Sequence, residues 1–125
     1  MDPSTGTRLD PILADVADRA RQRRQVHSLA DLRSQTLADP TRGQRFLAAL
    51  GAPELSIIAE CKRRSPSAGR LSAETDFPAR AEAYARGGAS ALSVLTEQDH
   101  FGGHPADLRA VEHVGLPRLR TDFLL

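Results

Sequence analysis

The chain has 125 residues, of which 40% are hydrophobic, and a formal net charge of +1, which suit one small domain. The near-neutral charge gives no reason to expect a nucleic acid partner, and no apolar run approaches the roughly 20 residues of a membrane span. The stretch MDPSTGTRLDP lacks the basic and apolar regions of a secretory signal, and Cys61 is the one cysteine. We therefore expect a cytoplasmic α/β protein without an internal disulfide or a membrane segment.

The first fifty residues have the pattern of helices. Asp10 and Pro11 form a helix start signal, in which a capping carboxylate precedes proline at the first helical position. Apolar residues then recur on one helical face: Ile12, Leu13, Val16, Ala17 and Ala20. Ser28 with Asp31 has the spacing of a capping box, which predicts a second short helix. A third helix is predicted over residues 41–50.

After these helices, short apolar runs alternate with helical segments. The run at residues 55–59 is short and nearly continuous, which indicates a strand buried on both faces. Two further strands are predicted at residues 91–96 and 118–124, and two helices at about residues 78–86 and 105–114. The order β-α-β-α-β predicts parallel strands that are joined by right-handed crossovers.

Polar residues stand where each predicted strand ends. Glu60 and Lys62 follow the first strand, Thr96 and Glu97 end the second, and Asp122 lies late in the third. Parallel α/β folds build their sites at the carboxyl ends of the strands. No Gly-x-Gly-x-x-Gly motif follows the first strand, which argues against a dinucleotide site. The sequence therefore predicts a site of another kind at this edge of the sheet.

Lys62 is the only lysine among the 17 basic residues of the chain. The codon usage of a GC-rich genome would explain the many arginines, but a site that needs a compact ammonium would also retain lysine there. Glu60 lies two residues away, on the same side of an extended chain. The pair is either a general acid with its positioning partner or a strand-end salt bridge of little energetic value.

Two loops after the strands carry further candidates. Ser65, in the loop KRRSPSAGR, offers a hydroxyl and nearby N–H groups to a carboxylate or phosphate, although Ser-Pro-Ser is also an ordinary turn sequence. Phe101, which two glycines follow, would form one wall of a pocket for a planar substrate or fill the end of the sheet. His100 and His104 flank it without a convincing third ligand, so we expect no metal. Phe123 is a second aromatic residue at the same edge.

Three segments together resemble the indole-3-glycerol phosphate synthase family of tryptophan biosynthesis: IIAECKRRSPSAGR, GGASALSVLTEQDHFGG and PRLRTDFLL. The resemblance covers about residues 9–125. It implies the N-terminal portion of a (β/α)8 TIM barrel, with about three parallel strands, because such a barrel needs eight strands and about 250 residues. Residues 1–50 would be a helical N-terminal extension, and residues 51–125 the first units of the barrel.

The resemblance also implies a reaction and roles for particular residues. The family closes the indole ring of 1-(2-carboxyphenylamino)-1-deoxyribulose 5-phosphate, with loss of carbon dioxide and water, and uses no cofactor. By the motif match, Glu60 and Lys62 are the catalytic pair, with Lys62 as proton donor. Ser65 would face the carboxylate of the substrate, and Phe101 and Phe123 would line the pocket for its aromatic ring.

The sequence departs from the family pattern at one position, and the expected length of the barrel raises a second question. The family has a lysine that acts as a general acid immediately before Asp-Phe, where this chain has Thr121. Loss of a positioned acid costs on the order of 10²–10⁴ in rate.

The phosphate-binding loops of the last two strands would lie beyond Leu125, and the third strand would have an unpaired apolar edge. We therefore also expect self-association or binding of a complementary barrel half through that edge. The alternative function is a non-catalytic half-barrel that binds such a half or the intact enzyme.

Overall fold

The structure is a computed structural model that describes residues 6–36, 39, 41–71 and 76–125. The chain divides into two units. The first contains two helices and Phe123–Leu125, and the second contains the remaining elements up to Asp122. Among the helices of the described ranges, none is long and apolar enough to cross a membrane.

The first unit confirms one helix start and corrects another. Helix α1 (Leu9–Val26) begins one residue before Asp10, so the prediction that Asp10 caps it is wrong. The Asp10 carboxylate instead accepts a hydrogen bond from the N–H of Thr7, at 3.0 Å, and lies in the first turn, where a negative charge is favourable. Helix α2 (Leu29–Gln35) begins with the predicted capping box, in which Ser28 and Asp31 each accept a hydrogen bond from the backbone of the other.

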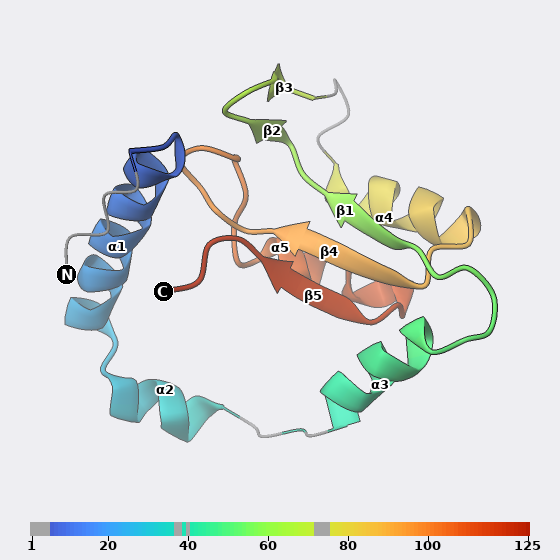
Figure 1. The fold of residues 1–125 in the computed structure, drawn as a ribbon. Coiled ribbons are helices and arrows are strands. Elements are labelled where there is room, and N and C mark those ends of the chain that lie inside the picture. Colours follow the sequence, from blue (N-terminus) through green and yellow to red (C-terminus); the bar gives the residue numbers. More distant parts are fainter. Residues whose placement is uncertain (1–5, 37–38, 40, 72–75) are drawn as a thin grey trace. The chain divides into compact units, whose positions relative to one another are not determined.

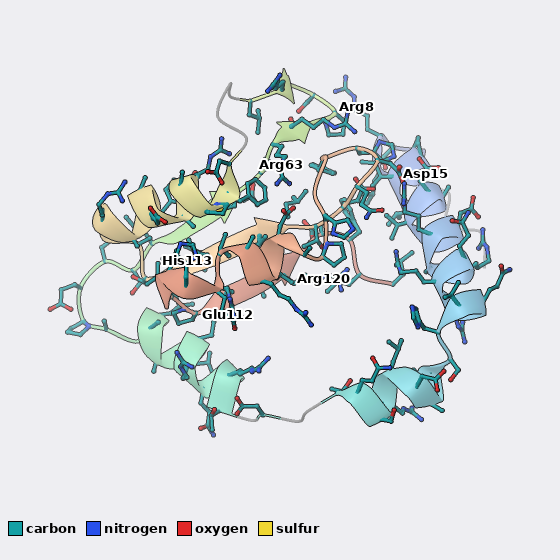
Figure 2. All side chains as sticks on the ribbon, turned by 180° about the vertical axis from the view of Figure 1, so that it is seen from behind. Arg8, Asp15, Arg63, Glu112, His113 and Arg120 are labelled. Carbon is teal, nitrogen blue, oxygen red and sulfur yellow. The ribbon has the colours of Figure 1, made fainter. Side chains whose placement is uncertain are left out.

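The second unit is built on a parallel sheet of three strands in the order β1-β4-β5 (Figure 1). Its elements are α3 (Thr41–Leu50), β1 (Ile58–Cys61), β2 (Arg64–Ser65), β3 (Gly69–Arg70), α4 (Phe77–Arg86), β4 (Ala91–Leu95), α5 (Asp107–Ala110), the 3-10 helix η1 (Glu112–Val114) and β5 (Arg118–Thr121). Helices α4 and α5 lie on the same face of the sheet, as the two opposite views show (Figures 1 and 2). The predicted β-α-β-α-β order is confirmed, but the single helix predicted over residues 105–114 is wrong, because α5 ends at Ala110 and the 3-10 helix η1 follows after Val111.

The core of this unit lies between the sheet and these helices. Its buried residues come from β1, β4, α4 and the segment before η1: Cys61, Leu92, Val94, Phe77, Ala81 and Val111. On the other face of the sheet, Ile58 and Leu119 are each 43% exposed. The sheet is therefore covered by helices on one face, and the opposite face is open at both outer strands.

Two of the predicted strand boundaries are wrong by three residues. Strand β1 begins at Ile58 rather than at Leu55, and Leu55 is 88% exposed, so this apolar run is not a strand buried on both faces. Strand β5 ends at Thr121, three residues before the predicted end, and Asp122 lies in a bend. Among the strands that the structure describes, only the central strand β4 is buried along its whole length, because it has a strand on each side.

Candidate active site

The predicted pair forms at the carboxyl end of β1. Lys62 Nζ lies 2.6 Å from Glu60 Oε1, and the side chains are 28% and 40% exposed. The intervening Cys61 points the opposite way, into the core, where it is fully buried. The alternation of a strand thus places both charged side chains on one side. An ion pair as exposed as this adds little to stability, so its main effect is to orient the ammonium.

Helix α4 contacts the backbone of both members of the pair. Arg80 Nη1 donates a hydrogen bond to the Lys62 carbonyl oxygen at 2.7 Å, and the Tyr84 hydroxyl donates one to the Glu60 carbonyl oxygen at 3.1 Å. Together with Leu71, these four residues line an open pocket of about 340 Å³. The sequence did not single out Arg80 or Tyr84, because their contacts depend on how the helix packs against the strand.

Ser65 belongs to a short antiparallel hairpin of β2 and β3, a feature that the sequence predicted only as a loop. Ser65 pairs with Gly69, whose φ of +64° is readily adopted only by glycine. The Ser65 hydroxyl accepts a hydrogen bond from the N–H of Ala68 at 3.2 Å and lies 3.4 Å from the Ser67 hydroxyl. Ser65 therefore helps to build the turn, and a role in binding the substrate carboxylate stays a prediction.

Phe101 lies in the loop after β4, which the buried carboxylate of Glu97 organises. Glu97 is 5% exposed and accepts hydrogen bonds from the N–H groups of Asp99, His100 and Phe101, at 2.9, 2.7 and 3.1 Å. Gly103 is required there, because a Cβ atom would lie 2.2 Å from the Leu95 carbonyl oxygen. Glu97 was predicted only as a polar strand end, and its geometry identifies it as the residue that shapes the Phe101 loop.

Arg63 links the loops after β1 and β4. It forms a bidentate ion pair with Asp107, at 2.6 and 3.0 Å, and Nη1 also donates to the Gly102 carbonyl oxygen at 3.1 Å. Its guanidinium lies over the Phe77 ring, 3.9 Å from the centroid, and Figure 2 shows Arg63 near the end of β1. The hydrogen-bonded Asp107 raises the pKa of Arg63. The loops that carry Ser65 and Phe101 are thus held to one another.

Thr121 has a hydrogen-bond partner in the sheet. Its hydroxyl lies 2.8 Å from the hydroxyl of Ser93, and its carbonyl oxygen accepts from the N–H of Thr96 at 2.7 Å. In the strand register Ser93 is the partner of Glu60, so the two hydroxyls lie on the same face of the sheet as that carboxylate. Phe123 groups with the first unit, so the structure describes it apart from this site.

Comparisons with known proteins agree with this arrangement. The family model for indole-3-glycerol phosphate synthase matches residues 9–125. The indole-3-glycerol phosphate synthase of Nocardioides sp. is 48% identical over 118 residues, which cover 94% of this chain and 45% of that protein. The protein of the same description from Parafrankia sp. is 48% identical over 120 residues, covering 94% and 42%, and that from Methanopyrus kandleri is 41% identical over 115 residues, covering 89% and 43%.

This chain spans less than half the length of the curated relatives that it matches. The match nevertheless includes the helices of the N-terminal half, the parallel sheet and the Glu60–Lys62 pair. The chain therefore belongs to the indole-3-glycerol phosphate synthase family, and its three parallel strands are the N-terminal portion of a (β/α)8 TIM barrel.

Proposed function

We propose that this chain supplies the N-terminal part of the active site of an indole-3-glycerol phosphate synthase, which acts in tryptophan biosynthesis in the cytoplasm. The substrate is the phosphorylated small molecule 1-(2-carboxyphenylamino)-1-deoxyribulose 5-phosphate. The observation that carries the proposal is the 2.6 Å contact of Lys62 with Glu60 at the carboxyl end of the first strand, the usual position of catalytic groups in such barrels.

The chemistry requires a proton donor at one oxygen atom. When the ring carbon that bears the carboxylate attacks the ketone carbon, the ketone oxygen takes up a proton. Carbon dioxide then leaves, and the electron pair of the broken bond restores the aromatic ring. The new hydroxyl departs as water after a second protonation, and the neighbouring carbon C1′ loses a proton, so that the indole double bond forms. The Lys62 ammonium, oriented by Glu60, is suited to donate to this oxygen, and such a general acid contributes about 10²–10⁴ in rate.

Ser65, Phe101 and Phe123 complete the proposed substrate contacts. The hydroxyl of Ser65 would donate to the substrate carboxylate, and the rings of Phe101 and Phe123 would pack against the aromatic ring of the substrate. The hydrogen bonds from the Phe101 loop to Glu97 support this role for Phe101, because they hold the loop in one conformation.

The experiment uses the 125-residue chain together with the separately expressed remainder of the barrel from the Nocardioides sp. relative. Formation of indole-3-glycerol phosphate is followed by fluorescence. We expect turnover on mixing, a further increase with Thr121→Lys, and none with Lys62→Met. Mixtures that contain both folded parts but give no turnover, even with Thr121→Lys, would contradict the proposed function.

A second candidate function is that of a half-barrel that binds a complementary half. The observation that favours it is the open face of the sheet, where Ile58 and Leu119 are each 43% exposed, whereas parallel sheets are normally covered on both faces. We infer that the other half of a barrel covers this face and pairs with the edge of β5. Size-exclusion chromatography with light scattering would detect this complex, and Leu119→Arg should weaken it.

A further inference from the structure

The two contacts between α4 and the end of β1 have matching spacings. Arg80 and Tyr84 are four residues apart on a helix, which corresponds to about 6 Å along its axis. The carbonyl groups of Glu60 and Lys62 are two residues apart on an extended chain, which corresponds to about 6.6 Å. A helix that lies along the strand can therefore reach both carbonyl oxygens at once, as the distances of 2.7 and 3.1 Å show.

The two carbonyl groups lie on the edge of β1 that faces away from β4. The Ile57 carbonyl oxygen accepts hydrogen bonds from the N–H groups of Ser90 and Ala91, which begin the β4 segment. Backbone groups alternate along a strand, so the carbonyls of Glu60 and Lys62 point to the opposite edge. Among the described strands none pairs with this edge of β1, and the side chains of α4 supply hydrogen bonds there.

The contact from Arg80 acts on the backbone of Lys62 itself. Lys62 lies one residue beyond the end of β1, where strand pairing no longer fixes its backbone. The half-buried Arg80 holds the peptide at this point, and Arg80 and Lys62 line the same pocket. Like charges repel, so an approach of the Lys62 ammonium to Arg80 is unfavourable, whereas its 2.6 Å contact with Glu60 is favourable.

We propose that Arg80 is a positioning residue for Lys62: it fixes the Lys62 backbone by the 2.7 Å hydrogen bond and keeps the ammonium on Glu60. Its importance for catalysis rests on the proposed function, because that function gives Lys62 its role. The geometric claim can be tested without turnover, since Lys62 is the only lysine of the chain. Lysine that is isotopically labelled at Cε gives one NMR signal, which reports the surroundings of this side chain alone.

The experiment compares the Lys62 signal in the full 125-residue chain and its variants. Glu60→Gln shows how far the signal moves when the ion pair is removed. In Arg80→Met we expect the signal to shift toward its position in urea. When Glu60→Gln is added to Arg80→Met, we expect a further shift that is less than about half of the shift that Glu60→Gln causes in the wild-type chain, because the effects of coupled neighbours are not additive. Arg80→Gln, which retains a donor, should give an intermediate position. Arg86→Met, an identical change at an exposed residue of α4, should leave the signal in place.

Backbone amide signals of β4 show whether each variant keeps its fold. An Arg80→Met chain with intact amide signals and an unmoved Lys62 signal would overturn the proposal, provided that Glu60→Gln moves the signal. Unfolding of both Arg80 variants would show that Arg80 serves stability, and this result would also overturn the proposal. A Lys62 signal that is the same in the folded wild-type chain and in urea would overturn it as well. Failure of the mixing assay to give turnover would contradict the proposed function and leave this geometric result standing.

Discussion

At the scale of single residues, the ion pair of Lys62 depends on the shape of its charged group. The 2.6 Å contact with Glu60 uses one ammonium nitrogen, which can still donate protons in two further directions. An arginine would present a planar fork that cannot transfer a proton in the same way. The excess of arginine in this chain therefore does not extend to the one position where the geometry favours lysine.

We predict that Lys62→Arg lowers kcat by about 10²–10⁴ in the reconstituted enzyme, because it keeps the charge and removes the proton donor. The fluorescence assay is best run in the Thr121→Lys background, where turnover is higher. Arg86→Lys, on the exposed side of α4, serves as the control and should leave kcat unchanged. A rate for Lys62→Arg near that of the control would show that the lone lysine reflects codon usage.

Thr121→Lys should raise activity and lower stability. The substitution removes the 2.8 Å contact between the hydroxyls of Thr121 and Ser93, and Ser93 is only 7% exposed. Loss of the partner of a buried hydroxyl costs about 1 kcal/mol. Urea unfolding of the single variant should show this decrease, and Ser93→Ala in the same background should recover part of it. Equal stability of Thr121→Lys and wild type would contradict the role of this hydrogen bond.

At the scale of elements, Arg63 and Asp107 hold two loops together. We predict that Asp107→Asn lowers the free energy of unfolding by about 3 kcal/mol, at the low end of the range for breaking a buried pair, because Arg63 remains 27% exposed. The matched change Glu112→Gln removes the ion pair with Arg118 at a carboxylate that is 67% exposed, against 12% for Asp107, and should have a much smaller effect. Urea unfolding measures both, and equal effects of the two variants would contradict the assignment.

Helix α2 should respond to pH through its capping box. Hydrogen bonds from the side chain and backbone of Ser28 lower the pKa of Asp31 below its usual 3.8. Because the pKa of Asp31 is lower in the folded chain than in the unfolded chain, the charged carboxylate stabilises the fold above about pH 4. This stabilisation is lost as the pH falls through the lowered pKa of the folded chain. Circular dichroism of the chain should show helix loss in this acid range. Ser28→Ala should reduce helicity already at neutral pH, where an unchanged spectrum would argue against the cap.

The elements also show what the sequence could predict. The Glu60–Lys62 pair and the Ser28 capping box depend on residues two or three positions apart, so local spacing was enough to find them. Arg63 and Asp107 are 44 residues apart, and only the crossover that brings β4 beside β1 makes them neighbours. The start of β1 was predicted too early because an apolar run indicates burial without showing what covers it, and Leu55 is 88% exposed.

At the scale of the whole molecule, Cys61 reports on cooperative opening. It is fully buried, and burial raises the pKa of its thiol above the usual 9.0, so both access and ionisation are suppressed in the folded chain. We predict that a thiol reagent modifies Cys61 in the folded chain at least about 100-fold more slowly than in the chain unfolded by urea. This factor corresponds to a free energy of about 3 kcal/mol for opening the core. Equal rates in buffer and in urea would show that the core is not formed.

The same thiol predicts a loss of stability in alkali. Because its pKa is raised in the folded state, the unfolded chain releases this proton first, and stability falls as the pH rises past about 9. Urea unfolding at pH 8 and at pH 10 measures the effect. The variant Cys61→Ala, compared with itself at the two pH values, should show a smaller decrease.

The order of the strands in the sheet follows their order along the chain. Strand β1 pairs with β4 from Ile58 and Ala91 onward, and β5 then adds to the free side of β4. No strand has to be inserted between two that have already paired. A ribosome that releases the chain from its N-terminus therefore presents each strand when its partner is already available. The sheet can thus assemble during synthesis one strand at a time, and each step creates the edge on which the next strand adds.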